Sequence, residues 1–232
     1  MSNNRNDRPL VISLFDYTGK MVQPWIEKGY EAIIVDIQHP DGWTHDGPLH
    51  KLGFDLSRPH KDLFHELLFA GYDLRDVALV FSFTPCTDMA VSGARWFASK
   101  LAKNPRMWDE ALHFAMQGPE LARRLGCPYM VENPVSKLST LWRKPDYSFQ
   151  PHEFTLFEPA DNYTKKTCLW TSPDFVMPMT AKDPRLGEPD DRIHKCPPSE
   201  ERMNIRSATP MGFARAVCEA NTTNQLPLFA AA

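Results

Sequence analysis

The first half of the chain alternates short apolar runs with longer amphipathic stretches. Continuous apolar runs of about four to six residues, bounded by turn residues, are typical of strands buried on both faces. We predict strands at 10–15, 32–36, 77–82 and 128–131, and helices at about 21–29, 60–71 and 105–125. Strands that alternate with helices form a mostly parallel sheet with helices on both faces, because the crossovers are right-handed. The pattern therefore predicts a doubly wound, Rossmann-like α/β fold.

The second half of the sequence is less regular. A further strand is expected at 167–170 and a helix at 208–221. Residues 171–206 are rich in proline and charge, which predicts a short irregular segment. A length of 232 residues favours a single domain, which we assign to residues 1–221, followed by a flexible tail at 222–232.

Composition narrows the class of protein. The chain is 42% hydrophobic and 24% charged, as in ordinary globular domains, and no apolar run approaches the ~18 residues of a membrane helix. The polar N-terminus lacks the apolar centre of a signal peptide, so we expect a cytoplasmic protein. The five cysteines form no CxxC pair, and the histidines between 39 and 65 match no zinc spacing, so we predict reduced thiols and no metal site.

Polar residues follow the first two predicted strands. Ligands of open parallel sheets bind beyond the carboxyl ends of the strands. Gly19 permits a tight turn into a helix N-terminus, which suits an anionic or carboxylate-bearing cofactor. Asp36 ends the second strand, where such folds bind ribose hydroxyls. Taken singly, each residue also fits an ordinary strand-to-helix turn or a solvated carboxylate.

The third and fourth strand ends carry a candidate nucleophile and a candidate acid. Cys86 lies just past the strand at 77–82, in a polar loop, where a nucleophile is more typical than a core thiol. Glu132 directly follows the apolar strand at 128–131. A carboxylate there is costly to bury unless it is paired, so Glu132 is a candidate acid or hydrogen-bonding group.

Pro85-Cys86 and Glu132-Asn133, preceded by the Gly19 turn and Asp36, resemble the DNA (cytosine-5) methyltransferase family over about residues 10–220. The resemblance implies the S-adenosyl-L-methionine-dependent methyltransferase fold, that cofactor, and single- or double-stranded DNA as partner. It makes Cys86 and Glu132 catalytic. It implies cofactor contacts from Phe15, Asp16, Thr18, Gly19, Asp36, Ile37 and Asp55, and substrate contacts from Pro85, Asn133, Lys165 and Lys166.

The implied chemistry accounts for these residue types. Cytosine C5 is a poor nucleophile until a thiolate adds to C6 and converts the ring into an enamine. We expect Glu132 to hold the base near N3, with a pKa raised by burial so that it can donate a proton. The base must leave a duplex to be reached, so base flipping is implied for double-stranded DNA.

Three departures from the family pattern bear on function. Tyr17 stands where the family usually has glycine, and Lys165 and Lys166 stand near its usual arginines, without their bidentate geometry. Only about forty residues separate Lys166 from Ser207, where the family carries a large target-recognition domain. We therefore expect specificity to be short, absent, or supplied by loops 87–106 and 133–150. Those loops combine cations and tryptophans that suit phosphate contact and base stacking, although solvated charges and core tryptophans explain them equally: Arg95, Lys100, Lys103, Arg106, Lys137, Arg143, Lys144, Trp96 and Trp142.

The tail and the departures leave other partners and functions open. Gln225, Leu226, Leu228 and Phe229 resemble the short peptides that bind the DNA polymerase sliding clamp, although the tail could instead pack on its own domain. The missing recognition region favours, as an alternative, C5 methylation of RNA or a pyrimidine nucleotide. Tyr17 motivates a second alternative, a non-catalytic protein that binds DNA or the clamp.

Overall fold

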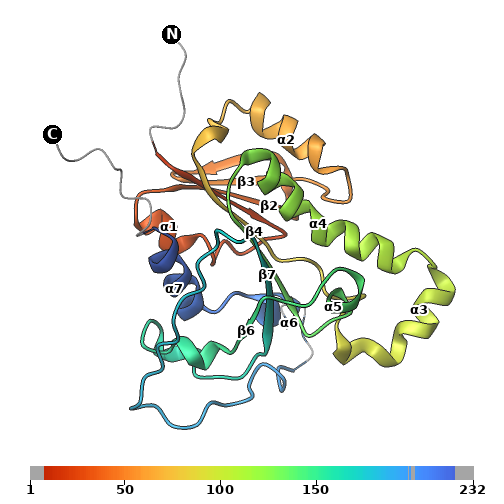
Figure 1. Ribbon diagram of the computed structural model, residues 1–232, viewed down its shortest axis with the longest axis vertical. Coiled ribbons are helices and arrows are strands. Elements are labelled where there is room, and N and C mark those ends of the chain that lie inside the picture. Colours follow the sequence, from red (N-terminus) through yellow and green to blue (C-terminus); the bar gives the residue numbers. More distant parts are fainter. Residues whose placement is uncertain (1–7, 198, 200–201, 223–232) are drawn as a thin grey trace.

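A seven-stranded, mostly parallel sheet forms the centre of the protein (Figure 1). The computed structural model describes residues 8–197, 199 and 202–222. The strand order is β3-β2-β1-β4-β5-β7-β6. The strands are β1 (Leu10–Leu14), β2 (Glu31–Asp46), β3 (Leu49–Gly53), β4 (Val77–Ser82), β5 (Tyr129–Pro134), β6 (Tyr147–Phe149) and β7 (Thr167–Thr171). The predicted α/β class and mostly parallel sheet are confirmed.

The helices lie on both sides of this sheet (Figure 1). They are α1 (Gln23–Glu27), α2 (His60–Phe69), α3 (Phe97–Lys103), α4 (Met107–Leu125), α5 (Leu138–Leu141), α6 (Arg202–Ser207) and α7 (Met211–Thr222). Short 3-10 helices form η1 (Leu74–Asp76), η2 (Val91–Trp96), η3 (Pro151–Phe154) and η4 (Pro159–Asp161). The 19-residue α4 ends at Gly126, whose positive φ of 68° closes the helix.

Alternation along β1 separates the two cores. Val11 packs with Trp25 of α1 and Phe213 of α7 on one face. Its neighbour Ile12 packs with Leu63 of α2 and with α4 on the other face. Successive strand residues point to opposite faces, so a strand covered on both sides must be apolar throughout. All five residues of β1 are buried, which explains the continuous apolar run in the sequence.

The central strands run parallel, whereas β7 is antiparallel to both β5 and β6. Leu14 pairs with Val35 of β2 and with Ser82 of β4, and Ser82 pairs in turn with Val131 of β5. This register aligns the carboxyl ends of the four predicted strands along one edge of the sheet. Residues that follow these strands are therefore brought to a common edge, as expected for ligand sites in such sheets.

The structure adds elements that the sequence pattern does not predict. Strands β3 and β6 are new, as are α3 and α6, and the predicted helix at 21–29 shrinks to α1. Strand β2 is extended beyond the predicted 32–36, because its second half folds back and pairs with β3 in reverse order. Gly42 and Gly47, both with positive φ, accommodate this return.

The irregular segment expected at 171–206 packs on its own domain. Ala181 exchanges backbone hydrogen bonds with two residues near η3: its N–H donates to Glu153 at 2.7 Å, and its carbonyl accepts from Leu156 at 2.8 Å. The backbone N–H of Asp183 donates to the Thr155 hydroxyl at 2.9 Å. The described part of this segment is thus a long ordered loop, and α6 begins near its end. In the described ranges, no helix is long and apolar enough to cross a membrane. The clamp-type peptide at 225–229 lies outside the described residues.

Candidate active site

Cys86 and Glu132 come together because Cys86 follows β4 and Glu132 lies in the neighbouring β5, which continues to Pro134, beyond the predicted end at 131. Strands β4 and β5 pair in parallel through Ser82 and Val131. Cys86 lies four positions beyond the end of β4, and Glu132 lies next to Val131. The side-chain amide of Asn133 donates a 2.8 Å hydrogen bond to the Thr84 carbonyl, which ties the end of β5 to the loop that carries Cys86.

Asn133 therefore holds the loop that carries Cys86 in place. Its side chain is buried, and its nitrogen is used by the bond to Thr84. Its Oδ1 atom is buried and has no hydrogen-bond partner among the described residues. A buried amide oxygen without a partner is unusual and costly. This oxygen is the group that Asn133 has available for the contact with substrate that the sequence predicts. That contact stays a prediction.

Electrostatic contacts join Cys86 and Glu132 to two cations. Burial raises the pKa of Glu132, and the positive charge of Lys165 opposes this rise. Burial also raises the pKa of the Cys86 thiol, and the nearby Glu132 carboxylate raises it further. Lys165 and Arg206 lower the Cys86 pKa. A carboxyl group that holds its proton beside a thiol can donate that proton while the thiol acts as nucleophile.

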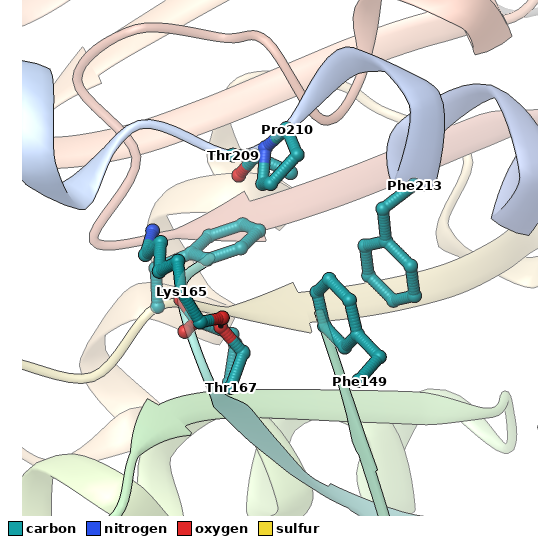
Figure 2. Close-up of a pocket in the computed structure, with 8 residues that line it drawn as sticks. Phe149, Lys165, Thr167, Thr209, Pro210 and Phe213 are labelled. Atoms are coloured by element: carbon teal, nitrogen blue, oxygen red, sulfur yellow. Dashed lines mark hydrogen bonds between the residues drawn. The ribbon is translucent and has the colours of Figure 1, made fainter. Parts of the chain in front are cut away.

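Lys165 links the strand-end residues to the C-terminal region. Its ammonium group donates to the carbonyls of Ser207 and Ala208 at 3.4 and 3.2 Å. It lines a narrow pocket whose walls come from β5, β6, β7 and the turn before α7 (Figure 2). The lining residues are Phe83, Glu132, Phe149, Lys165, Thr167, Thr209, Pro210 and Phe213. The pocket thus has a charged wall at Glu132 and Lys165.

The opposite wall of this pocket is aromatic. Phe149 and Phe213 stack face to face with ring centroids 3.8 Å apart (Figure 2). The close approach of α7, which carries Phe213, to η3 requires Gly212, because a Cβ there would lie 2.6 Å from the Phe154 carbonyl oxygen. Asp161 accepts the Gly212 backbone N–H at 2.7 Å.

The two consecutive lysines have different surroundings. Lys166 is exposed and influences the pKa of Cys168, whereas Lys165 influences those of Cys86 and Glu132. Successive side chains of an extended chain point to opposite sides, which accounts for the difference between these two lysines just before β7. The structure thus brings Lys165 into the predicted site and does not bring Lys166 there. Arg206 is a member of this electrostatic group that sequence reasoning missed.

The turn after β1 uses most of its polar groups internally. Phe15 has a positive φ of 56°, a conformation that costs energy for a residue with a side chain. The Asp16 carboxylate accepts from the Ser13 hydroxyl and from the Gly19 N–H, both at 2.7 Å, and from the Thr18 hydroxyl at 3.4 Å. Burial raises the Asp16 pKa, and these donors oppose the rise. Asp16 therefore shapes the turn in which Gly19, with φ of 67°, is placed.

Asp36 and Asp55 approach this turn through the sheet register. Asp36 pairs with Gly53 of β3, two positions before Asp55. Asp36 is buried, and its Oδ1 accepts the Gln38 N–H at 2.8 Å; no hydrogen bond to its Oδ2 is found in the described part of the chain. Ile37 beside it is 69% exposed. Asp55 is exposed, and a hydrogen bond from the Ser57 N–H lowers its pKa.

Tyr17 is accommodated by a contact outside the turn. Its ring is 45% exposed and stacks on His39, with centroids 5.4 Å apart. His39 is buried, and its Nε2 lies 3.1 Å from the Asp16 carbonyl oxygen. The bulky side chain that replaces the expected glycine thus packs on a histidine that contacts the turn.

Neither the known family models nor the curated proteins include a match to this chain. Among the residues that the structure describes, no group of three or more histidine, cysteine or acidic side chains is arranged to hold a metal ion. The functional interpretation therefore depends on the motifs and on the geometry of the strand ends.

Proposed function

We propose that the protein methylates cytosine C5 in DNA, with S-adenosyl-L-methionine as methyl donor. The observation that carries the proposal is the juxtaposition of Cys86, Glu132 and Lys165 at one edge of a doubly wound sheet. Lys165 lies just before β7, which runs antiparallel between β5 and β6 and so brings this lysine to the same edge.

The residues at the ends of β1 and β2 fit the proposed cofactor. Asp36 offers one carboxylate oxygen at the end of β2, suited to ribose hydroxyls. The exposed side chain of Ile37 offers an apolar surface beside it, and Gly19 lets the chain turn tightly after β1. When bound there, S-adenosyl-L-methionine would supply the methyl group.

Cys86 and Glu132 would activate the base together. After the thiol loses its proton to solvent, Sγ of Cys86 forms a bond to C6 as the electrons of the C5–C6 double bond shift through the ring. In its protonated form, which burial favours, Glu132 donates its proton to N3 and so neutralises the charge that attack produces. Lys165 then stabilises the carboxylate that remains. C5 would then gain the methyl group, with S-adenosyl-L-homocysteine as leaving group, and lose its proton to water. Elimination breaks the Sγ–C6 bond, returns the N3 proton to Glu132 and releases the Cys86 thiolate.

Mass spectrometry of nucleosides tests the reaction. The protein is incubated with S-adenosyl-L-methionine and either single- or double-stranded DNA, with a Cys86→Ala variant in parallel. We expect 5-methylcytosine from the unmodified chain and none from the variant. Absence of any methylated base on both DNA forms would contradict the proposal.

A second substrate class is favoured by the absence of a recognition domain between Lys166 and Ser207. The same Cys86 chemistry would then act on RNA or on a free pyrimidine nucleotide. Methylation of RNA or nucleotide, with none on DNA, would select this alternative. Failure to bind S-adenosyl-L-methionine in calorimetry, with DNA or clamp binding intact, would select a non-catalytic binding protein.

We also propose that the tail binds a DNA polymerase sliding clamp. The supporting observation is the sequence Gln225-Leu226-Pro227-Leu228-Phe229, in which spaced apolar side chains would fill a preformed pocket. Tethering to a clamp on DNA raises the local concentration of DNA without sequence recognition. In calorimetry with a bacterial clamp, truncation after Thr222 should abolish binding; equal affinity of the truncated chain would refute the tail as the contact.

A further inference from the structure

A surface segment rich in basic residues follows the loop that carries Cys86, and none of its residues is buried. We call residues 91–106 the basic arm; it comprises η2, α3 and three residues after them. No residue of the arm is buried. It contains four cationic and no acidic side chains, in a chain whose net charge is −3: Arg95, Lys100, Lys103 and Arg106. A local positive surface of this kind attracts a polyanion although the whole chain is acidic.

The base of the arm is fixed beside the active site. The Val91 N–H donates to the Val135 carbonyl at 3.0 Å, and the Lys137 N–H donates to the Met89 carbonyl at 2.9 Å. These bonds join the loop after Cys86 to the loop after β5. The arm itself lies at the periphery of the molecule, beyond α5 (Figure 1).

Lys100 makes a third connection to the loop that carries Cys86. Its ammonium group donates to the Thr87 carbonyl at 2.9 Å and to the Asp88 carboxylate at 2.7 Å. Thr87 directly follows Cys86. A strand of nucleic acid that lies along the arm would therefore pass close to the nucleophile.

Trp96 gives the arm an aromatic surface. Its side chain is 54% exposed, and the Arg95 guanidinium lies over its ring, 5.1 Å from the centroid. An exposed aromatic ring with neighbouring cations is the combination by which proteins bind single strands, because bases stack on the ring and phosphates meet the charges.

We infer that the basic arm binds single-stranded DNA next to the target cytosine, with an unpaired base stacked on Trp96; this inference rests on the proposed function. Bases within a duplex are already stacked on both sides, so Trp96 can accept only an unpaired one. The cations contact phosphates without reading sequence. A single-stranded substrate also needs no target-recognition domain, which agrees with the ordered loop found in its place.

Fluorescence anisotropy with a labelled 20-nucleotide single strand, and with its duplex, tests the inference without requiring turnover. Trp96→Ala should weaken single-strand binding by roughly 5- to 100-fold, as for other base-stacking aromatics, and leave duplex binding nearly unchanged. Phe69→Ala is the matched control, because Phe69 is 88% exposed at the end of α2, away from the arm. Its single-strand affinity should not change.

Salt dependence separates the cations from the aromatic ring. Replacing Lys103 and Arg106 by glutamine should reduce the slope of log affinity against log salt by about 1.4, at roughly 0.7 per phosphate contact. Lys61→Gln, on α2, should leave the slope unchanged. Both arm variants should melt at the temperature of the unmodified protein, because the arm contains no buried residue.

Unchanged single-strand affinity of Trp96→Ala, or an equal loss on the duplex, would overturn the inference. This outcome is distinct from failure of the proposed function. If the arm variant binds single strands normally and the unmodified protein methylates DNA, only the inference about the arm is refuted. Loss of single-strand binding in the variant, with no methylation by the unmodified protein, supports the arm and refutes the reaction.

Discussion

The sheet edge has two halves, a proposed catalytic half at β4, β5 and β7 and a proposed cofactor half at β1 and β2, and they use their polar side chains in different ways. In the catalytic half, Cys86, Glu132 and Lys165 influence one another, although they come from distant parts of the sequence. In the cofactor half, carboxylates accept hydrogen bonds from residues at most three positions away, as at Asp16 and Asp36. The cofactor half is thus shaped by local bonds, whereas the catalytic half is assembled by the packing of the whole sheet.

This difference determines where substitutions should act. A change in the catalytic half alters the charge felt by the nucleophile and should affect the chemical step. A change in the cofactor half alters a local turn or strand end and should affect cofactor affinity.

The largest effect is expected at Glu132. Glu132→Gln keeps a hydrogen-bond donor but cannot transfer a proton, so the rate of methyl transfer should fall by about 10²- to 10⁴-fold. Affinity for S-adenosyl-L-methionine should stay the same. Single-turnover methylation and calorimetry measure the two quantities, and the exposed Glu188 supplies a matched control as Glu188→Gln. A large loss of cofactor affinity in Glu132→Gln would show that the halves are not separate.

The converse effect is expected at Asp36. Asp36→Asn retains an oxygen for the Gln38 N–H but loses the charge that would accept ribose hydroxyls, so affinity for S-adenosyl-L-methionine should fall by roughly 10-fold. The rate at saturating cofactor should change little. Asp55→Asn, at an exposed carboxylate, is expected to have a smaller effect. Unchanged binding in Asp36→Asn would remove Asp36 from the cofactor site.

The smallest effect concerns the pH dependence of Cys86. Burial and the Glu132 charge raise its pKa, so alkylation should reach half its maximal rate above the ordinary thiol pKa of about 8.5. Glu132→Gln removes a negative neighbour and should move this midpoint down. Lys165→Met removes a positive neighbour and should move it up. Peptide mapping after iodoacetamide treatment separates Cys86 from the other cysteines, and shifts of the opposite sign would contradict the proposed electrostatic contacts.

The sequence predicts the buried strands well because their pattern is local. The expected strand at 77–82 coincides with β4, whose six residues are all buried. Strand β3 shows no apolar alternation because one of its two buried positions is His50, and two of the three residues of β6 are exposed. These edge strands depend on pairing with a neighbour, which no short apolar run reveals.

The candidate site shows the same limit. Cys86 and Glu132 could be named because each directly follows a recognisable strand or motif. The different positions of Lys165 and Lys166 could not be foreseen, because the side on which each residue lies depends on where β7 begins. Arg206 belongs to no motif, and only the fold brings its charge near Cys86.

Trapping of a covalent complex tests the central claim most directly. DNA that contains 5-fluorocytosine in place of cytosine blocks the final elimination, because fluorine replaces the proton that must leave C5. With S-adenosyl-L-methionine present, we predict a protein–DNA adduct that survives denaturation and maps to the peptide containing Cys86. Cys86→Ala should give none. Absence of an adduct on DNA that the protein demonstrably methylates, or an adduct at another cysteine, would contradict the role assigned to Cys86.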